Sequence, residues 1–541
     1  MPFLSRFVNR QNGCSRRELF RQGGLLSTAA LASAATVNTG SSENNVPLTS
    51  SGTLYEAIGV HPLINARGTF TIITGSETLP PVKQAMEAAS RSYVQMDELM
   101  DGVGKKLAEL TRAPWGIVTA GCAAALTNCT AASLVGTNPE RMERLPDLTG
   151  LKSEVIIPTY SRNVYDHAVR MTGVKIVEVA EASDLEGSFT ERTAMVYILA
   201  GPGDDGPLGT EAISNVARRH NVPVLVDAAA EILTIPNVHL GRGATAVAYS
   251  GGKCLRGPQA AGMVLGEKNF LQAAWANSAP HHAFGRSLKM GKEEIMGMLA
   301  AVECWTTRDH QAEWRQWVAN LQNISTAVQK VSGVTTRVIQ PDGLSNRTPE
   351  LRIEWDANRI GITGEELSRL LFDTEPRIAL AGGSGRRPDK MASAVSVVPY
   401  MMMPGDTEIV AERLYAVLSR PPKFENPSIP SGEPASVAGQ WGLEIQFLRG
   451  SAIHTLILEQ HGTQLLGTHR GEFVSGDLTG SVNAEEVRFH SVQRIQGQTL
   501  SYVFTGTVTG DKMAGKVNLG EYGEAEWKAE RHQYSAHVER R

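Results

Sequence analysis

One lysine in the sequence has the position needed for covalent chemistry on a carbonyl compound. Lys253 lies in a Gly-Gly-Lys turn directly after an apolar run at residues 244–248, which predicts a strand. The glycines leave room for other groups to approach the amine closely. An amine that is shielded from water and held near a partner is a good nucleophile toward an aldehyde. Alone, the stretch favours a solvated loop lysine, so the interpretation depends on residues upstream.

Asp227, upstream of this lysine, is a second candidate for contact with the same ligand. Residues 222–226 are apolar and rich in valine, which predicts a strand buried on both faces, and this strand ends at Asp227. In open α/β sheets, ligands bind at the carboxyl ends of the strands. A carboxylate there can pair with a protonated pyridine nitrogen, so the pair predicts a site for pyridoxal 5'-phosphate. The alternative role of Asp227 is to cap a helix in the Ala-rich segment that follows.

A phosphate site is expected where a turn of small residues opens a helix. Residues 115–127 fit this pattern, with Gly121, Cys122 and Ala123 at the turn between a predicted strand and a predicted helix. A helix N-terminus with exposed backbone amides binds anions readily. Any small-residue turn packed against a sheet has the same pattern. Along the chain, the small-residue turn at Gly121 (the phosphate cradle) comes first, then Asp227 and then Lys253. This is the order of the same features in the large domain of fold-type I pyridoxal-phosphate enzymes.

At these residues the chain resembles the SelA-like branch of fold-type I enzymes, and within it the members similar to D-glucosaminate-6-phosphate ammonia-lyase. The resemblance covers roughly residues 53–420 and is carried by the stretches 64–86, 119–126, 162–179, 224–231, 250–266 and 285–295. It implies Lys253 as the lysine that forms an aldimine with the cofactor and Asp227 as the partner of the pyridine nitrogen. It also implies Gly121, Cys122 and Ser250 on the phosphate side. The resemblance leaves the substrate open.

Other residues are candidates for contacts with the ring and the substrate. In this fold an aromatic or imidazole ring covers the pyridine face, and His167 is the first candidate, followed by Tyr165. A histidine exposed on a helix is the alternative interpretation. Arg377, in the predicted smaller domain, is a candidate for gripping a substrate carboxylate with two parallel hydrogen bonds. Its alternative is a surface ion pair.

A basic segment before a long predicted helix is a further candidate for anion binding. Arg286 and Lys292 in this segment suit an anionic substrate, or the cofactor phosphate of a neighbouring subunit, because this fold usually places its sites at dimer interfaces. The alternative is a solvated segment that caps the helix at residues 293–308. The preceding pair His281 and His282 lacks further plausible ligands, and the cysteines show no metal-ligand spacing, so no metal site is predicted.

The first fifty residues have the features of an export signal. Arg16 and Arg17 are followed by Phe20, by a weakly hydrophobic stretch at residues 23–35 and by an Ala-Ser-Ala cleavage pattern at residues 32–34. Paired arginines before a mild hydrophobic region are typical of a twin-arginine signal. This predicts export by the twin-arginine machinery to the periplasm or outside the cell. That route carries folded proteins, so a cofactor can be loaded in the cytoplasm first.

The length and the patterning predict several units behind this signal. The 541 residues are too many for one hydrophobic core. Alternating helical and short β patterns predict an α/β large domain at residues 51–305 and a smaller α/β domain at 306–420. Residues 421–437 form a Pro-rich linker. Residues 438–541 show about eight short alternating runs, which predict an antiparallel β-barrel or sandwich. Glycine pairs at residues 476–480 and 506–510 are interpreted as turns between its strands.

The composition excludes some classes of partner. A net charge of -4 gives no electrostatic reason to expect nucleic-acid binding. No apolar run reaches the roughly 18 residues that a membrane helix needs. The expected partners are therefore a small amino-acid-like substrate and a second copy of the chain, in a homodimer or a higher homo-oligomer.

The predicted function is a pyridoxal-phosphate enzyme that carries out an α,β-elimination on a small amino acid or amino-sugar acid. Transamination and selenium or sulfur transfer, which the resemblance also covers, are the alternatives. Selenium transfer onto tRNA is disfavoured because the signal leaves no room for a tRNA-binding N-terminal domain and the chain lacks a basic surface signal. A second hypothesis is an exported binding protein without catalysis on the same fold, although binding alone would need neither Lys253 nor Asp227.

Overall fold

The computed structural model describes residues 54–426, 428 and 430–533, so the predicted export signal lies outside the described residues. The chain divides into two compact units, Met1–Pro62 and Leu63–Arg541. In the first unit, the described residues include a short 3-10 helix, η1 (Glu56–Ile58), which ends at Gly59 in the left-handed conformation. The second unit contains both α/β sheets and the β-barrel.

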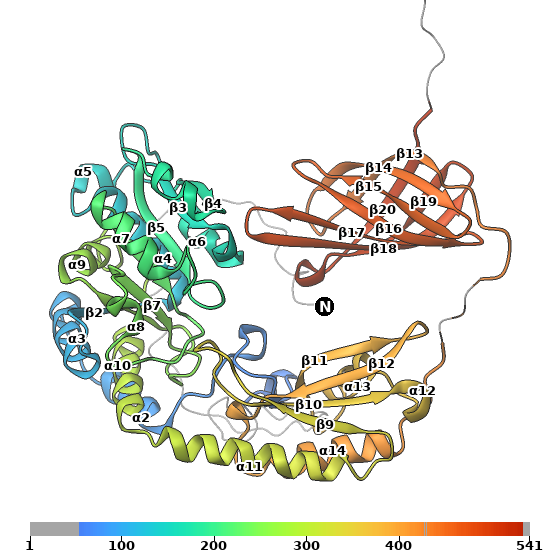
Figure 1. The fold of residues 1–541 in the computed structure, drawn as a ribbon, viewed down its shortest axis with the longest axis horizontal. Helices are drawn as coiled ribbons and strands as arrows, with labels where there is room; N and C mark the ends of the chain where they lie inside the picture. Colours follow the sequence, from blue (N-terminus) through green and yellow to red (C-terminus); the bar gives the residue numbers. More distant parts are fainter. Residues whose placement is uncertain (1–53, 427, 429, 534–541) are drawn as a thin grey trace, which may run out of the picture. The chain divides into compact units, whose positions relative to one another are not determined.

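A seven-stranded sheet forms the centre of the large α/β domain (Figure 1). Its order is β2-β8-β7-β6-β5-β3-β4, and β8 alone among these strands runs antiparallel to its neighbours. The bounds are β2 (Trp115–Thr119), β3 (Glu154–Pro158), β4 (Lys175–Val179), β5 (Thr193–Leu199), β6 (Val224–Asp227), β7 (Ala246–Ser250) and β8 (Gly262–Gly266). Because β5, β6 and β7 are parallel, their carboxyl ends lie at one edge of the sheet, as the sequence predicts.

Helices connect and cover these strands on both faces, which leaves the central strands fully buried. They are α2 (Pro80–Ser90), α3 (Met96–Thr111), α4 (Gly121–Val135), α5 (Pro139–Met142), α6 (His167–Arg170), α7 (Thr210–Arg219), α8 (Val238–Gly241), α9 (Lys268–Ala276) and α10 (Lys292–Thr307). Helix α4 is buried along almost its whole length and is rich in alanine, which lets it pack closely on the sheet. Cys122 and Cys129 on α4 are buried free thiols, as expected for small core residues.

A five-stranded sheet of order β1-β11-β12-β10-β9 forms the smaller domain. Its strands are β1 (Ile64–Ala66), β9 (Thr335–Ile339), β10 (Glu350–Asp356), β11 (Ile378–Arg386) and β12 (Lys390–Val397). The predicted boundaries placed residues 51–305 in the large domain, but β1 pairs in parallel with β11 of the smaller sheet. The smaller domain is therefore discontinuous in sequence. A strand of three residues carries too little pattern to reveal its partner.

Four helices belong to the smaller domain: α11 (His310–Val328), α12 (Ala357–Ile360), α13 (Gly364–Asp373) and α14 (Asp406–Ser419). Helix α13 begins with a capping box, in which the Thr363 side chain accepts from the Glu366 amide and the Glu366 carboxylate accepts from the Thr363 amide. The apolar sides of α11, α13 and α14 form a second hydrophobic core with the five-stranded sheet.

A closed barrel of eight antiparallel strands follows the Pro-rich linker, which confirms the predicted all-β domain (Figure 1). The strands are β13 (Gly439–Gln446), β14 (Ser451–His461), β15 (Gln464–Arg470), β16 (Ser475–Asn483), β17 (Glu486–Ile495), β18 (Gln498–Thr509), β19 (Lys512–Asn518) and β20 (Glu524–Arg531). Each strand pairs with the next, and β20 pairs with β13 to close the ring. A third apolar core fills much of its interior.

The interpretation of residues 476–480 as a turn was wrong, because both glycines lie inside β16. A Cβ added at Gly480 would lie 2.3 Å from the Arg488 carbonyl oxygen of the neighbouring strand. These glycines therefore allow close approach between strands rather than a change of direction.

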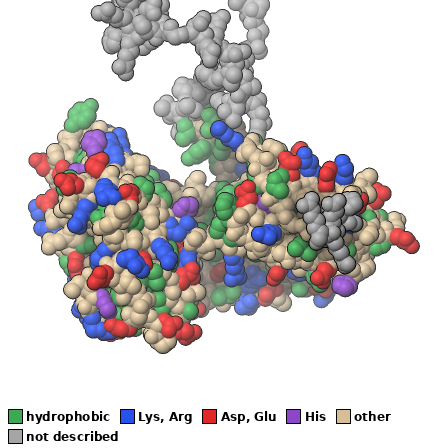
Figure 2. All heavy atoms as spheres, turned by 90° about the horizontal axis from the view of Figure 1, so that it is seen from above, with side chains coloured by type: hydrophobic (Ala, Val, Ile, Leu, Met, Phe, Trp, Pro, Cys, Tyr) green, Lys and Arg blue, Asp and Glu red, His purple; other side chains and the backbone are tan. Residues whose placement is uncertain are grey.

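Charged side chains of both signs are intermixed over the face drawn in Figure 2. In the part of the chain that the structure describes, no helix has the length and apolar character of a membrane span.

Candidate active site

Asp227 is the last residue of β6, and its carboxylate is buried among hydrogen-bond donors. The amide of Ala229 donates to Oδ1 at 3.0 Å, and the Cys122 thiol donates to the same oxygen at 3.3 Å. The Tyr197 hydroxyl donates to Oδ2 at 3.0 Å. Burial raises the pKa of Asp227, while these donors and Lys253 oppose that rise. The predicted cap of a following helix is not its role, because residues 228–230 do not begin one.

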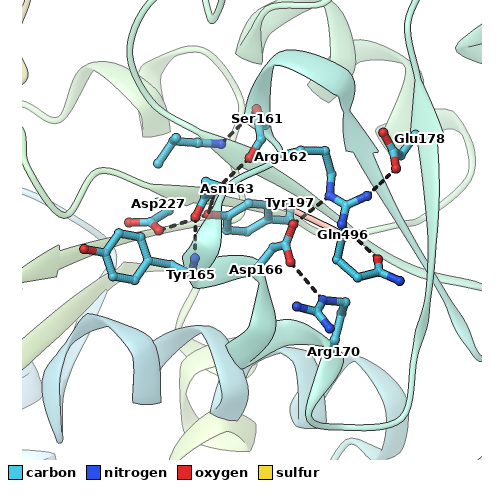
Figure 3. A network of polar contacts seen from close by, with 11 residues as sticks. Ser161, Arg162, Asn163, Tyr165, Asp166, Arg170, Glu178, Tyr197, Asp227 and Gln496 are labelled. Atoms are coloured by element: carbon cyan, nitrogen blue, oxygen red, sulfur yellow. Dashed lines mark hydrogen bonds and ion pairs between the residues drawn. The ribbon is translucent and has the colours of Figure 1, made fainter. Parts of the chain in front are cut away.

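Tyr197 connects Asp227 to a second polar side chain, as Figure 3 shows. Burial and the neighbouring carboxylate raise the pKa of Tyr197 well above its usual range, so the hydroxyl stays protonated and donates to Asp227. The amide nitrogen of Asn163 in turn donates to the Tyr197 oxygen at 3.0 Å. The amide orientation is fixed because the same nitrogen also donates to the Ser161 carbonyl at 2.7 Å.

Lys253 lies in the turn that follows β7, the strand that pairs with β6. Its positive charge opposes the rise of the Asp227 pKa and of the Cys122 pKa. The turn is tight because the Gly251 amide donates to the Ala261 carbonyl at 2.8 Å. A Cβ at Gly251 would lie 2.8 Å from that same oxygen, so the position requires glycine.

The predicted phosphate cradle forms a compact corner of small residues. Ser250 at the end of β7 pairs with Gly262 of β8, and Gly262 also pairs with Thr119 before α4. A Cβ at Gly262 would lie 2.7 Å from the Cys122 amide nitrogen. Gly121 has a φ of +80°, which favours glycine, and no side chain caps the start of α4. These features leave backbone amides at the N-terminus of α4 available to a phosphate, so the corner fits the cofactor.

The cradle differs from the sequence interpretation in the direction of one side chain. The Cys122 thiol points to Asp227 rather than toward the phosphate, and burial raises its pKa well above the usual range. Its backbone amide stays at the helix start together with that of Ala123. The structure thus brings Gly121, Cys122, Ala123 and Ser250 to the same corner of the sheet.

The two candidates for covering the pyridine ring lie in consecutive short elements. Tyr165 belongs to the 3-10 helix η4 (Val164–Asp166), its ring is exposed, and its amide donates to the Asn163 side chain at 2.7 Å (Figure 3). His167 is the exposed first residue of α6. Neither role is decided by these positions, and both remain predictions.

A buried ion-pair network holds the segment between Asn163 and α6 in place. Asp166 is fully buried and accepts from Arg162 at 2.6 Å and from Arg170 at 2.9 Å. Arg162 also pairs with Glu178 next to the end of β4. Because the carboxylate is paired on both oxygens, it fixes the backbone between Asn163 and α6. That backbone carries Tyr165 (Figure 3).

A second buried cluster fixes the segment that follows Asp227. His239 Nε2 lies 2.6 Å from the Glu231 carboxylate, and its Nδ1 lies 3.7 Å from the Asp204 carboxylate, which also pairs with Arg242. The three potential ligand atoms lie within 4.8 Å of one another. The nearest contacts of the two carboxylates are to opposite nitrogens of the one imidazole ring. The arrangement is that of a buried charge cluster that connects two loops.

A cavity of about 190 Å³ opens beside the turn that carries Lys253. Cys254 and Ala230, which adjoin the lysine turn and the Asp227 segment, both line it. Its wall also includes three arginines, Arg256, Arg308 and Arg347. The cavity lies between the large domain and the loop before β10, which the Asn346 amide anchors by donating to the Ala230 carbonyl at 2.8 Å.

The arginines give this cavity a positive field. Burial and the nearby Arg308 lower the pKa of Arg256, while Glu77 and Glu313 oppose this shift. Arg308 pairs with Glu313 at 3.0 Å. Arg256 donates to the neutral carbonyl of Glu77 at 3.0 Å. Arg347 has no ion-pair partner among the residues that the structure describes. A bound anion would therefore relieve repulsion inside the cavity.

The three cations selected from the sequence lie elsewhere. Arg377 donates to the Phe372 carbonyl at 2.7 Å and lies over the Phe372 ring, within the smaller domain. Lys292 pairs with Glu293 at the start of α10. Arg286 is exposed. None of them lines the cavity, so their substrate roles remain predictions.

Several residues of the candidate site have no signal in the sequence. Tyr197 lies inside a uniformly apolar strand pattern, where a tyrosine is indistinguishable from core. Arg256 was visible only as the third residue after Lys253, with no pattern of its own. Arg308 ends a helix and Arg347 lies in a loop, so neither has a local signal.

Comparisons with known proteins agree with this geometry. No protein-family model matches the chain. D-glucosaminate-6-phosphate ammonia lyase of Salmonella typhimurium is 26% identical over 372 residues, which span 67% of this chain and 96% of the relative. A 5'-C-glycyluridine monooxygenase-decarboxylase of a Streptomyces species is 28% identical over 307 residues, or 54% of this chain and 75% of that protein. A solved structure of D-glucosaminate-6-phosphate ammonia-lyase is 25% identical with a TM-score of 0.60 and covers 68% of this chain and 99% of its own.

The fold is that of fold-type I pyridoxal-phosphate enzymes. Both curated relatives are enzymes, and the chain is an enzyme too. Since 67% of this chain is aligned with almost the whole ammonia lyase, about a third of it has no counterpart in that alignment.

Proposed function

We propose that the chain is a pyridoxal-phosphate enzyme that removes ammonia from a small amino acid or amino-sugar acid by α,β-elimination. The observation that carries the proposal is the buried Asp227 at the end of β6, with Lys253 in the turn after the neighbouring strand β7 and the small-residue corner of α4 nearby. The similarity to a protein named as an ammonia lyase supports elimination over other reactions of this fold.

The residues present would hold the cofactor at three points. Lys253 would bind its aldehyde carbon, Asp227 would pair with its pyridine nitrogen, and the backbone amides at the start of α4 would bind its phosphate. When bound, the cofactor supplies an electron sink for a carbanion at the substrate α-carbon. Tyr197 and Cys122 orient the Asp227 carboxylate, since both donate to it.

Lys253 is the residue that would transfer the substrate proton. A neutral amine at this position would take the proton from the substrate α-carbon. The β-substituent would leave together with a proton, and water outside the site would hydrolyse the released enamine to a keto acid and ammonia. The buried position of the neighbouring side chains keeps water away from this exchange.

The charges that line the cavity beside the Lys253 turn support an anionic substrate. Arg256, Arg308 and Arg347 supply more positive charge than Glu313 compensates, so the substrate carries an anionic group away from its amine. A guanidinium binds a carboxylate or a phosphate through two parallel hydrogen bonds. An acidic amino acid or a phosphorylated amino-sugar acid would meet this requirement.

The cofactor is tested by the absorbance spectrum of the purified protein with and without borohydride. We expect an aldimine band that borohydride traps at Lys253 and that Lys253→Ala abolishes. Lys292→Ala is the matched control, since this lysine pairs with Glu293 at the start of α10. No band after addition of pyridoxal phosphate would remove the proposal and revive a binding role without catalysis.

The reaction is tested by incubating the holoenzyme with acidic and phosphorylated amino acids and amino-sugar acids. Elimination predicts ammonia and a keto acid in equal amounts, with no added amino acceptor. Transamination would need a keto acid acceptor and release no ammonia, so this outcome would replace elimination. Selenium or sulfur transfer would likewise require an added donor.

We also propose that the chain functions as a homodimer or higher homo-oligomer after twin-arginine export. The proposal of export rests on Arg16 and Arg17 before the hydrophobic stretch, which lie outside the described residues. Replacing both by lysine is expected to retain the protein in the cytoplasm, as cell fractionation would show. Arg21→Lys, which leaves the pair intact, is the control, and unchanged export of the double variant would refute the assignment.

A shared site at the dimer interface is tested by complementation. If Arg286 serves the neighbouring subunit, co-expression of the Lys253→Ala and Arg286→Ala chains restores activity that neither has alone. A mixture as inactive as its components would place Arg286 outside the site.

A further inference from the structure

The turn between β17 and β18 of the barrel contacts the segment that precedes α6 in the large domain. Gln496 Oε1 accepts a hydrogen bond from Arg162 Nη2 at 3.0 Å, and both side chains are drawn in Figure 3. Gly497 approaches the backbone of Asn163 so closely that a Cβ added to it would lie 2.1 Å from the Asn163 carbonyl oxygen. Both residues of the turn therefore contact adjacent residues of the large domain.

The conformation of this turn does not explain its sequence. Ile495 pairs with Gln498, so Gln496 and Gly497 are the two central residues of the hairpin. Gln496 has a φ of +53°, which favours glycine, whereas the φ of Gly497 lies outside the left-handed range. A hairpin optimised by itself would have its glycine at the first central position. The glycine at the second position is instead explained by its close approach to Asn163.

The contacting turn lies at the more apolar end of the barrel. In an up-and-down barrel every second turn lies at the same end, so the turns after β13, β15 and β19 lie at the end of the β17–β18 turn. These three turns carry large exposed apolar side chains, which are Leu448, Phe473 and Tyr522. The turns at the opposite end, residues 462–463, 484–485 and 510–511, contain only small or polar residues. The end that carries Gln496 is therefore the one suited to contact another part of the protein.

The segment on the other side of this contact orients donors of the candidate active site. Asn163 Nδ2 donates to the Tyr197 hydroxyl at 3.0 Å, and that hydroxyl donates to Asp227. The side-chain oxygen of Asn163 accepts from the Tyr165 amide at 2.7 Å, and its carbonyl accepts from the Asp166 amide at 3.3 Å. A displacement of Asn163 would therefore disturb a continuous series of bonds that ends at Asp227.

Arg162 is held by acceptors from both domains. Its Nε donates to Asp166 at 2.6 Å and its Nη1 donates to Glu178, while its Nη2 donates to Gln496 of the barrel. Each guanidinium nitrogen thus has its own acceptor, and the barrel supplies the third. Hydrogen bonds from a charged donor are the stronger kind, so this bond would hold the turn against the segment.

We propose that the barrel is a positioning domain for the active site, in which the β17–β18 turn fixes Arg162 and Asn163 and thereby the donors to Asp227. Gln496 is a positioning residue, because it acts on the site only through Arg162 and the segment beside it. The inference rests on the proposed function for its effect on pyridoxal phosphate binding. The contact itself can be measured without the cofactor.

The contact is tested by amide hydrogen exchange of the apoprotein, measured on peptides that contain the segment before α6. The amides of Tyr165 and Asp166 donate to Asn163, so their exchange reports how firmly this segment is held. Gly497→Ala is expected to speed this exchange roughly tenfold, because the added Cβ would collide with Asn163. The φ of Gly497 itself lies outside the left-handed range, so alanine does not strain the turn.

Two substitutions of Gln496 test the same contact by charge. Gln496→Glu keeps an acceptor for Arg162, so the exchange should stay slow. Gln496→Lys brings a like charge to Arg162 and should speed the exchange roughly tenfold. Gln498→Ala is the control for glutamine, since this side chain bonds within the barrel. Gly442→Ala is the control for glycine, since an added Cβ would lie 3.9 Å from its nearest neighbour. Exchange as slow in Gln496→Lys and Gly497→Ala as in the wild type would overturn the contact.

The effect on the site is measured by titrating each apoprotein with pyridoxal phosphate. Gly497→Ala and Gln496→Lys should weaken cofactor binding roughly tenfold, the effect of losing one hydrogen bond in the series that ends at Asp227. Gln496→Glu should bind the cofactor like the wild type. Faster exchange with unchanged cofactor affinity would refute the positioning role. A wild type that binds no cofactor would contradict the proposed function, whereas faster exchange in the two variants would still establish the contact of the barrel with the segment.

Discussion

The hydroxyl of Tyr197 donates a hydrogen bond of 3.0 Å to the Asp227 carboxylate, on the next strand of the sheet. The two residues stand at the carboxyl ends of β5 and β6, where a ligand meets the sheet. Tyr197 thus works with Cys122 and Ala229 against the burial that raises the pKa of Asp227. A protonated pyridine nitrogen requires a charged Asp227, so in the proposed function Tyr197 would act on the cofactor through this carboxylate.

Tyr197→Phe is expected to weaken cofactor binding and to lower kcat by roughly tenfold, the effect of losing one hydrogen bond to a charged group. Cofactor affinity and kcat are measured by titrating the apoenzyme with pyridoxal phosphate. Tyr249→Phe is a matched control, because this tyrosine is equally buried but its hydroxyl bonds to Asn237 at 2.6 Å. Equal losses of cofactor affinity in both variants would assign Tyr197 a purely structural role.

Asp227→Asn is expected to stabilise the cofactor-free protein while abolishing most activity. Because burial raises the pKa of Asp227 in the folded state, its contribution to stability is complete below the ordinary carboxyl pKa and is lost as the pH rises through the raised value. The asparagine variant has no such loss.

The advantage of the variant therefore grows as the pH rises through this window and is constant above it. Thermal unfolding of both apoproteins from pH 4.5 to 8 measures the difference. A difference that is independent of pH would show that the pKa of Asp227 is not raised in the apoprotein.

The cavity arginines are expected to control substrate affinity. Arg347→Ala and Arg256→Ala should each raise KM roughly tenfold or more with a smaller effect on kcat, because each removes a charged donor to the substrate anion. Arg377→Ala is the comparison, since its guanidinium is held by Phe372. Steady-state kinetics with any substrate that the enzyme converts measures KM and kcat for the three variants. A larger KM effect for Arg377 than for Arg347 would restore the assignment made from sequence.

The residues that could be predicted from sequence are those whose role follows from a local pattern. Asp227 ends an apolar strand, Lys253 lies in a glycine turn after another strand, and Gly121 opens a small-residue helix. Each can be located without knowing what packs against it. The same holds for the barrel, because alternation with a period of two is a property of each strand alone.

The missed residues depend on contacts between distant parts of the chain. Tyr197 becomes functional only because β5 lies beside β6, and β1 joins the smaller sheet only because β11 is its partner. Arg308 and Arg347 meet at one cavity from a helix end and a loop. The sequence predicts Arg377, in the smaller domain, as the substrate arginine. In the structure its guanidinium instead donates to the Phe372 carbonyl of the same domain. Charge alone does not tell which arginine faces a cavity.

The buried histidines of the barrel predict a loss of stability in acid. Burial and the neighbouring His454 lower the pKa of His469 from its ordinary value to about 3. A lowered histidine pKa contributes stability above the ordinary value near 6.5, and this contribution falls as the pH drops toward 3, at about 1.4 kcal/mol per pH unit.

His469→Gln should remove most of this slope, because glutamine does not titrate. Urea unfolding at pH 7 and 5, followed by ¹⁹F NMR of fluorotryptophan at Trp441 and Trp527 in the barrel core, measures the slope in the full chain. His490→Gln, on the exposed side of β17, is the control and should retain the wild-type slope. A wild-type barrel that is equally stable at both pH values would mean that His469 can accept a proton without leaving its buried site.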